Sequence, residues 1–170
     1  MIRRTTLALL CLGVALPGGA IAQQPAKTLK QQLVGTWTFV VTEATLPDGK
    51  KSLPFGPNPQ GVNIFTEDGH FAQIQINSAI PKIAADSRVS GTAEENKAVV
   101  QGSLAIFGAY TVDETTKILH YKVESSTYPN WVGQQQERKI ELLTADEFTN
   151  SNQVGSIAGA KTVNVWKRGR

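Results

Sequence analysis

The side chains best suited to acid–base chemistry in this sequence lie around His120. By period-two alternation, Lys122 and Glu124 share the face of His120, and this pattern is typical of a solvated strand face. Burial of His120 in a polar cavity beside Tyr110 or Arg138 is the alternative. Such a site would place a group that titrates near neutral pH next to a bound molecule.

Other signatures of catalytic and metal sites are missing from the sequence. It has no Gly-x-Ser-x-Gly motif, no phosphate-binding loop and no dinucleotide fingerprint. Its two histidines, His70 and His120, do not form a local pair of zinc ligands, and its one cysteine, Cys11, lies near the N-terminus. We therefore expect no metal site, no cofactor and no thiol nucleophile.

Residues 1–22 have the features of a secretory signal peptide. Arg3 and Arg4 form a charged start, Leu7–Leu16 is an apolar stretch, and Ala20-Ile21-Ala22 fits the small-x-small cleavage pattern. The apolar stretch is much shorter than the roughly 20 residues that a membrane-spanning helix needs. We expect cleavage before Gln23, a periplasmic or secreted protein, and no membrane span after cleavage.

Cleavage at this position changes the charge and the redox chemistry of the chain. The full sequence has 17 Lys and Arg against 14 Asp and Glu, and the loss of Arg3 and Arg4 leaves the two signs almost balanced. The mature chain has no basic patch of the kind that nucleic-acid-binding proteins use, so we expect no nucleic-acid partner. It also loses Cys11, so its stability has to come from burial rather than from disulfides.

The rest of the chain alternates apolar and polar residues in eight short segments separated by turn residues. These segments are Thr38–Leu46, Val62–Thr66, His70–Asn77, Leu104–Val112, Ile118–Ser126, Glu137–Leu143, Glu147–Asn152 and Thr162–Lys167. Asp68-Gly69 is the sharpest hairpin signal. Thr92 and Glu95 have the spacing of a capping box and predict a short helix to about Val100.

These segments predict an all-β fold: an eight-stranded up-and-down antiparallel β-barrel with one short helix, or a sandwich of two sheets. Residues 31–170 would form this single domain, after a polar and flexible segment over residues 23–30. An eight-stranded barrel has an interior that is either filled by side chains or able to hold one small ligand.

One local motif favours the barrel. Gly35-Thr36-Trp37 is similar to the Gly-x-Trp motif that opens the first strand of lipocalins. The glycine allows the chain to turn sharply into the barrel base, and the indole closes that end. The resemblance implies a cation–π contact between Trp37 and a cation of the last strand, for which Arg168, or else Lys167, is placed.

Further stretches resemble a bacterial lipocalin-like domain family, and together they cover nearly all of the mature chain. They are Leu33–Trp37, Gly108–Glu114, His120, Ser126–Gly133, Gln136–Arg138 and Val165–Arg168. The resemblance implies an eight-stranded calycin barrel and leaves the ligand open.

The aromatic segment Tyr128–Trp131 indicates where a ligand would enter. Two aromatic rings beside a proline at the end of a strand either line a barrel mouth or form a rigid loop that covers it. Taking the first interpretation, we predict a small apolar or amphipathic ligand bound by Tyr110, His120, Trp131 and Arg138. The inward strand positions would be mainly Val, Ile, Leu and Phe.

Two other functions stay open at this point. A barrel cavity can fold an apolar substrate and act as an isomerase or cyclase, which convergence of His120, Tyr110 and Arg138 would favour. A filled interior would instead favour an interaction or structural module. The sequence does not indicate an oligomeric state.

Overall fold

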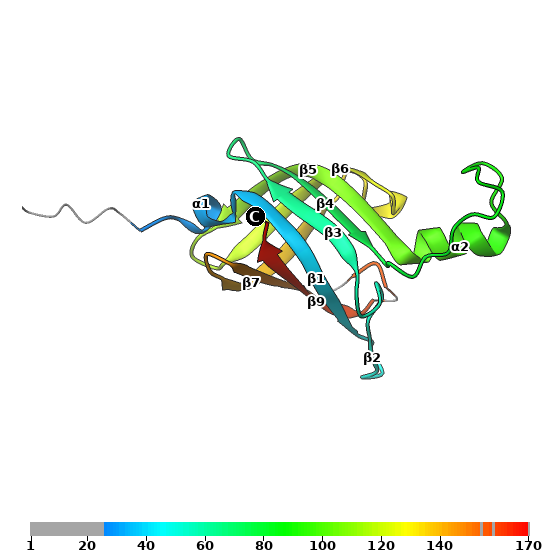
Figure 1. The fold of residues 1–170 in the computed structure, drawn as a ribbon. Coiled ribbons are helices and arrows are strands. Elements are labelled where there is room, and N and C mark those ends of the chain that lie inside the picture. Colours follow the sequence, from blue (N-terminus) through cyan, green and yellow to red (C-terminus); the bar gives the residue numbers. More distant parts are fainter. Residues whose placement is uncertain (1–25, 154, 158, 170) are drawn as a thin grey trace, which may run out of the picture.

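The computed structural model describes residues 26–153, 155–157 and 159–169. These residues form one closed barrel with a helix at each end (Figure 1). The signal peptide predicted over residues 1–22 lies outside the described residues.

The described strands form one antiparallel sheet in chain order, apart from a short extra strand at its start. They are β1 (Gly35–Thr45), β2 (Lys51–Ser52), β3 (Gln60–Phe65), β4 (His70–Ile76), β5 (Ser103–Asp113), β6 (Ile118–Ser126), β7 (Gln135–Leu143), β8 (Glu147–Asn152) and β9 (Lys161–Arg168). Strand β1 pairs with β9 from Trp37↔Arg168 to Thr45↔Lys161, which closes the barrel. The eight-stranded up-and-down barrel predicted from the sequence is confirmed, with β2 as an addition.

The helix α1 (Leu29–Leu33) lies across one end of the barrel (Figure 1). Thr28 and Gln31 form its capping box. The carboxylate of Glu114, in the β5–β6 turn, accepts hydrogen bonds from the backbone N–H groups of Leu29 (2.7 Å) and Lys30 (3.1 Å). A negative charge at a helix N-terminus is favourable, so this contact fixes α1 over the barrel base.

The helix α2 (Ala93–Gly102) projects from the opposite end, together with the loop that precedes it (Figure 1). The predicted capping box is present: Thr92 Oγ1 accepts from the Glu95 N–H, and Glu95 accepts from the Thr92 N–H. A short 3₁₀ helix, η1 (Pro129–Trp131), lies in the β6–β7 connection.

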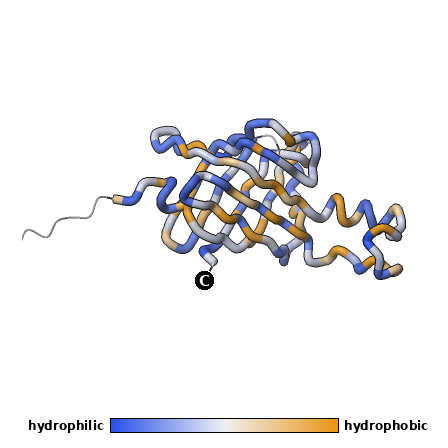
Figure 2. Tube along the Cα trace, turned by 90° about the horizontal axis from the view of Figure 1, so that it is seen from above, coloured by the Kyte–Doolittle hydropathy of each residue, from blue (hydrophilic) through white to orange (hydrophobic). Residues whose placement is uncertain are grey.

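Hydrophobic and hydrophilic residues alternate along the strands (Figure 2), but the alternation does not always place the apolar residues inside. On β4, Gln73 and Gln75 are buried, whereas Ile74 and Ile76 on the outer face are 39% and 38% exposed. The prediction of an interior made mainly of Val, Ile, Leu and Phe is therefore wrong for this part of the barrel.

Candidate ligand-binding site

The end of the barrel beneath α1 is closed by aromatic side chains. Trp37 is fully buried, packs against Phe148 at 5.5 Å between ring centroids, and donates from Nε1 to the carbonyl of Leu33 at 2.7 Å. The guanidinium of Arg168 lies 3.8 Å from the centre of the Trp37 ring, well within the range of a cation–π contact. These contacts fill the interior of the barrel at this end, and the cavities around α1 lie outside it.

Gly35 and Arg168 connect this closed end to the strand that begins there. Gly35 has a φ of +123°, and a Cβ at this position would lie 3.0 Å from Arg168 Nη1. Arg168 donates to the carbonyls of Gln32 and Val34 with Nη2 and Nη1, and to that of Ala145 with Nε. The arginine therefore ties α1 to the first and last strands.

The middle of the barrel contains a hydrogen-bonded layer of buried amides and hydroxyls. Asn63 donates to Gln73 (3.3 Å), and Gln73 donates to Gln75 (2.8 Å). Gln75 then donates to Thr42 (3.0 Å) and Asn164 (3.3 Å). Most of these buried groups have hydrogen-bond partners within the layer, which offsets the cost of removing them from water. Asn63 Oδ1 is the exception, because it has no partner among the described residues.

The layer continues to the neighbouring strands. Asn164 donates to Asn150 Oδ1 at 3.1 Å, and Asn63 donates to the hydroxyl of Tyr121 at 3.3 Å. Tyr121 is fully buried, and this burial raises the pKa of its phenol. The phenol therefore stays neutral and acts as a hydrogen-bonding group.

A small cavity of about 30 Å³ lies against this layer. Its polar wall includes Thr42, Gln73, Gln75, Arg138 and Asn164, and its apolar wall includes Phe55, Leu104, Trp131 and Ile157. A cavity of this size has room for about two water-sized groups.

A second, larger cavity of about 470 Å³ lies at the barrel end from which α2 projects. Residues of β5, α2, the β2–β3 connection and the β6–β7 connection line it, among them Pro54, Val100 and Tyr128. It shares Phe55, Leu104, Ser156 and Ile157 with the inner cavity, so the two adjoin at the barrel mouth.

Arg138 is the charged side chain that β7 contributes to the inner cavity. It is 5% exposed, and its guanidinium carbon lies 5.5 Å from the Trp131 ring centre and 5.7 Å from that of Tyr121. Burial lowers the pKa of Arg138, and the neighbouring Tyr121 opposes that shift. A guanidinium remains charged despite such shifts, so the cavity wall holds a positive charge.

Two of the four predicted ligand-binding residues, Trp131 and Arg138, meet at the inner cavity. Tyr110 and His120 do not lie there. Tyr110 packs at the closed end, where its hydroxyl donates to the Thr66 carbonyl at 2.8 Å. His120 is on the outer face, with Nδ1 3.6 Å from Glu137 Oε1, as its alternation with Lys122 and Glu124 indicated.

Sequence reasoning missed the amide layer and Tyr121. The sequence spacing contains a signal for the amide layer. Gln73 and Gln75, and likewise Asn150 and Asn152, are two residues apart and therefore lie on the same face of their strand. The expectation of an interior made mainly of Val, Ile, Leu and Phe left no place for buried amides.

The chemistry available at the two cavities is that of hydrogen bonding, aromatic packing and one cation. Among the described residues, no group of three or more His, Cys, Asp or Glu side chains is arranged to hold a metal ion. No helix within the same residues is long and apolar enough to cross a membrane.

The chain is 35% identical over 69 residues to the 4'-hydroxy-3'-methoxypropiophenone carrier protein ppsC of Aspergillus oryzae; the match covers 36% of this chain and 61% of the relative. The chain thus spans less than two thirds of that protein's length.

Designed proteins are among the solved structures that the chain resembles. A redesigned β-barrel is 15% identical, with a TM-score of 0.43, and the match covers 83% of this chain and 95% of the design. A fluorescence-activating β-barrel designed de novo is 13% identical, with a TM-score of 0.43 and coverage of 85% and 100%. The lipocalin-like domain family matches residues 34–169, and the chain therefore belongs to that family.

Proposed function

We propose that this protein binds a small amphipathic molecule at the barrel mouth. The apolar body of the molecule occupies the larger cavity, and its polar end enters the inner cavity. The single observation that carries this proposal is the direct contact between an apolar-rimmed cavity of about 470 Å³ and a polar cavity of about 30 Å³.

The dimensions support a ligand of modest size. Small-molecule sites commonly have volumes of roughly 300–1,000 Å³ and combine apolar walls with a few polar groups that orient the ligand. The mouth cavity falls in this range. The closed aromatic end sets the depth, so the ligand lies in the half of the barrel that faces α2 (Figure 1).

Binding is favoured over catalysis by the groups that face the cavities. Amides and hydroxyls form most of the polar wall, and these groups orient a molecule without exchanging protons near neutral pH. The fungal relative is named as a carrier of an aromatic ketone, which supports the same type of function here. Export to the periplasm or the medium is part of the proposal, and it rests on the sequence of residues 1–22.

Tryptophan fluorescence tests this function. A panel of naphthalene compounds (2-naphthol, 2-acetylnaphthalene, 2-naphthoate and methyl 2-naphthoate) should quench the protein in a saturable way. Trp131 lines the inner cavity, whereas Trp37 and Trp166 are fully buried. Trp131→Phe should therefore remove most of the quenching while calorimetry still detects binding.

Trp166→Phe is the matched control, and it should retain the quenching. If calorimetry detects no binding of any member of the panel, the proposed function is refuted. Quenching that is lost in Trp166→Phe and kept in Trp131→Phe would place the ligand elsewhere.

A further inference from the structure

Arg138 differs from every other buried residue that the structure describes, because it alone has a formal charge. The other buried polar residues are threonines, asparagines, glutamines and a serine. A charge removed from water is costly unless it is paired, and proteins usually pair it with the opposite charge. Arg138 therefore requires an explanation.

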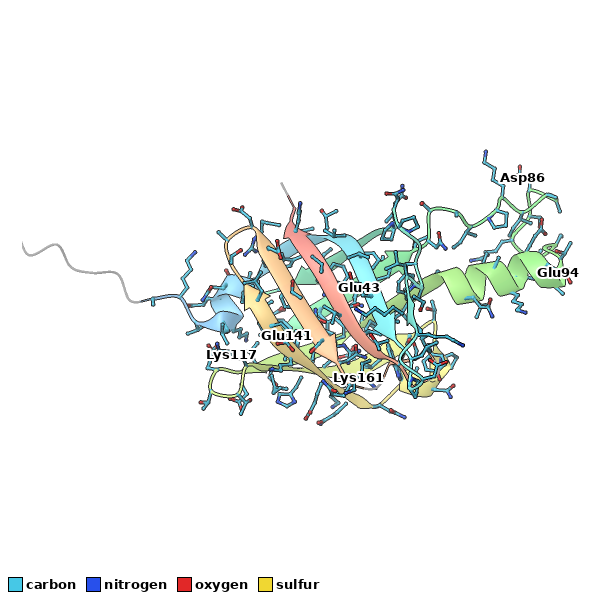
Figure 3. The ribbon with its side chains drawn as sticks, turned by 90° about the horizontal axis from the view of Figure 1, so that it is seen from below. Glu43, Asp86, Glu94, Lys117, Glu141 and Lys161 are labelled. Atoms are coloured by element: carbon cyan, nitrogen blue, oxygen red, sulfur yellow. The ribbon has the colours of Figure 1, made fainter. Side chains whose placement is uncertain are left out.

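The described protein groups around Arg138 do not include a carboxylate partner within 4 Å. Glu137 points to the outer face toward His120, and Glu141 contacts Lys139 (3.3 Å) and Ser151 (2.7 Å) there. Figure 3 shows Glu43 on β1 and Glu141 on β7, both exposed, and Asp86 and Glu94 on the projecting arm. The acidic side chains of the barrel wall thus face solvent.

The neutral contacts of Arg138 leave part of its guanidinium unused. Nη1 makes both hydrogen bonds, to the Glu137 carbonyl at 2.9 Å and to Gln136 Oε1 at 3.4 Å. The rings of Tyr121 and Trp131 contact the guanidinium within cation–π range. Nε and Nη2 have no acceptor among the described residues. The N–H donors of a guanidinium lie in one plane and can bind both oxygens of a carboxylate, so these free donors suit such a group.

The position of the charge matches the shape of the cavities. Arg138 lines the inner cavity, which has room for about two water-sized groups. The two oxygens of a carboxylate are of that size. The larger cavity above it accepts an apolar body.

On the basis of the function proposed above, we propose that the ligand is a carboxylic acid whose carboxylate enters the inner cavity and pairs with Arg138. The acid supplies the negative charge that the barrel interior lacks. Its aromatic or aliphatic body lies against Phe55, Leu104 and Tyr128 at the mouth.

Arg138 also lines a side cleft of about 330 Å³ between β7 and β8, beside Lys139 and Ser151. An anion bound there would contact Lys139, whose side chain is 56% exposed. Lys139 is therefore a suitable control, because it is the next residue of the same strand, carries the same charge and faces outward.

The test compares 2-naphthoate with methyl 2-naphthoate, which share a body and differ in charge. Calorimetry on the wild-type protein should give a Kd for the acid about 10- to 100-fold lower than that for the ester, the range expected for hydrogen bonds to a charged group. Arg138→Met should remove this preference, so that the Kd values of the acid and the ester come within about twofold of each other. Lys139→Met should retain it.

A thermal unfolding midpoint of unliganded Arg138→Met at or above that of the wild type would agree with an unpaired charge. If this variant does not fold, Arg138→Lys replaces it in the test. Its preference for 2-naphthoate over the ester should be smaller than that of the wild type, because lysine lacks the paired donors of a guanidinium. Equal binding of acid and ester to the wild type would overturn the inference and leave the proposed function intact. Loss of the preference in Lys139→Met would also overturn it, and binding of neither compound would refute both proposals.

Discussion

Replacing Trp37 with alanine should destabilise the protein by about 3–5 kcal/mol, the range for removing a large buried aromatic side chain. Trp37 is fully buried, and its indole N–H donates to the Leu33 carbonyl. The substitution would also leave the Arg168 guanidinium without the ring that it covers at 3.8 Å. Urea denaturation followed by circular dichroism measures the loss.

The matched control for this substitution is Phe107→Ala. Phe107 is a large aromatic residue on the outer face of β5 and is 51% exposed, so its loss should change the free energy of unfolding by about 0.5 kcal/mol or less. A loss below about 1 kcal/mol for Trp37→Ala would show that the aromatic base does not hold the barrel closed.

Replacing Gly108 with alanine should cost about 3 kcal/mol, the upper part of the range for overpacking. A Cβ at Gly108 would lie 2.0 Å from the Lys122 carbonyl oxygen and 2.9 Å from the Glu124 nitrogen. The pairing of β5 with β6 shifts register between Phe107 and Gly108. Because backbone atoms block the methyl group, the two strands have to separate.

Ala109→Ser is the control for Gly108→Ala. It also adds one heavy atom, on the adjacent residue of β5, whose side chain is half-buried on the outer face. Its effect should stay within about 0.5 kcal/mol. Equal unfolding free energies for Gly108→Ala and the wild type, measured by urea denaturation, would contradict the close approach of β5 and β6 at this point.

The barrel could be predicted from the sequence because each of its signals is local. Asp68-Gly69 specifies a hairpin, Thr92 and Glu95 specify a helix start, and the period-two segments specify strands of the observed lengths to within a few residues. Closure was implied by the resemblance of Gly35-Thr36-Trp37 to the lipocalin motif, and this segment lies where the first strand begins and the last strand ends.

The interior could not be predicted in the same way because strand alternation gives two faces without saying which one is inside. An interior made mainly of Val, Ile, Leu and Phe would place Ile74 and Ile76 inside, but the register of β3, β4 and β5 places Gln73 and Gln75 there instead. The partners that make those amides stable, such as Thr42 and Asn164, are distant in sequence.

The position of a residue inside the barrel depends on contacts that are distant in sequence, so only two of the four predicted ligand-binding residues lie at the inner cavity. Trp131 and Arg138 come together across the β6–β7 connection, a contact that lies close in sequence. Tyr110 is inside the barrel, but it lies at the closed end and does not reach the inner cavity. The height of a residue along the barrel axis depends on the stagger of all the strands, which the sequence of one strand does not specify. His120 follows the outward alternation of β6.

The most direct test of ligand binding at the mouth is an NMR titration of isotope-labelled protein with 2-naphthoate. The shifts should be largest for the backbone of Phe55, Leu104 and Ile157 and for the side-chain amides of Gln75 and Asn164, which line the adjoining cavities. The competing apolar surface is the outer face of β3–β5, where Ile64, Ile74 and Phe107 are exposed. Shifts confined to that outer face would contradict binding inside the barrel.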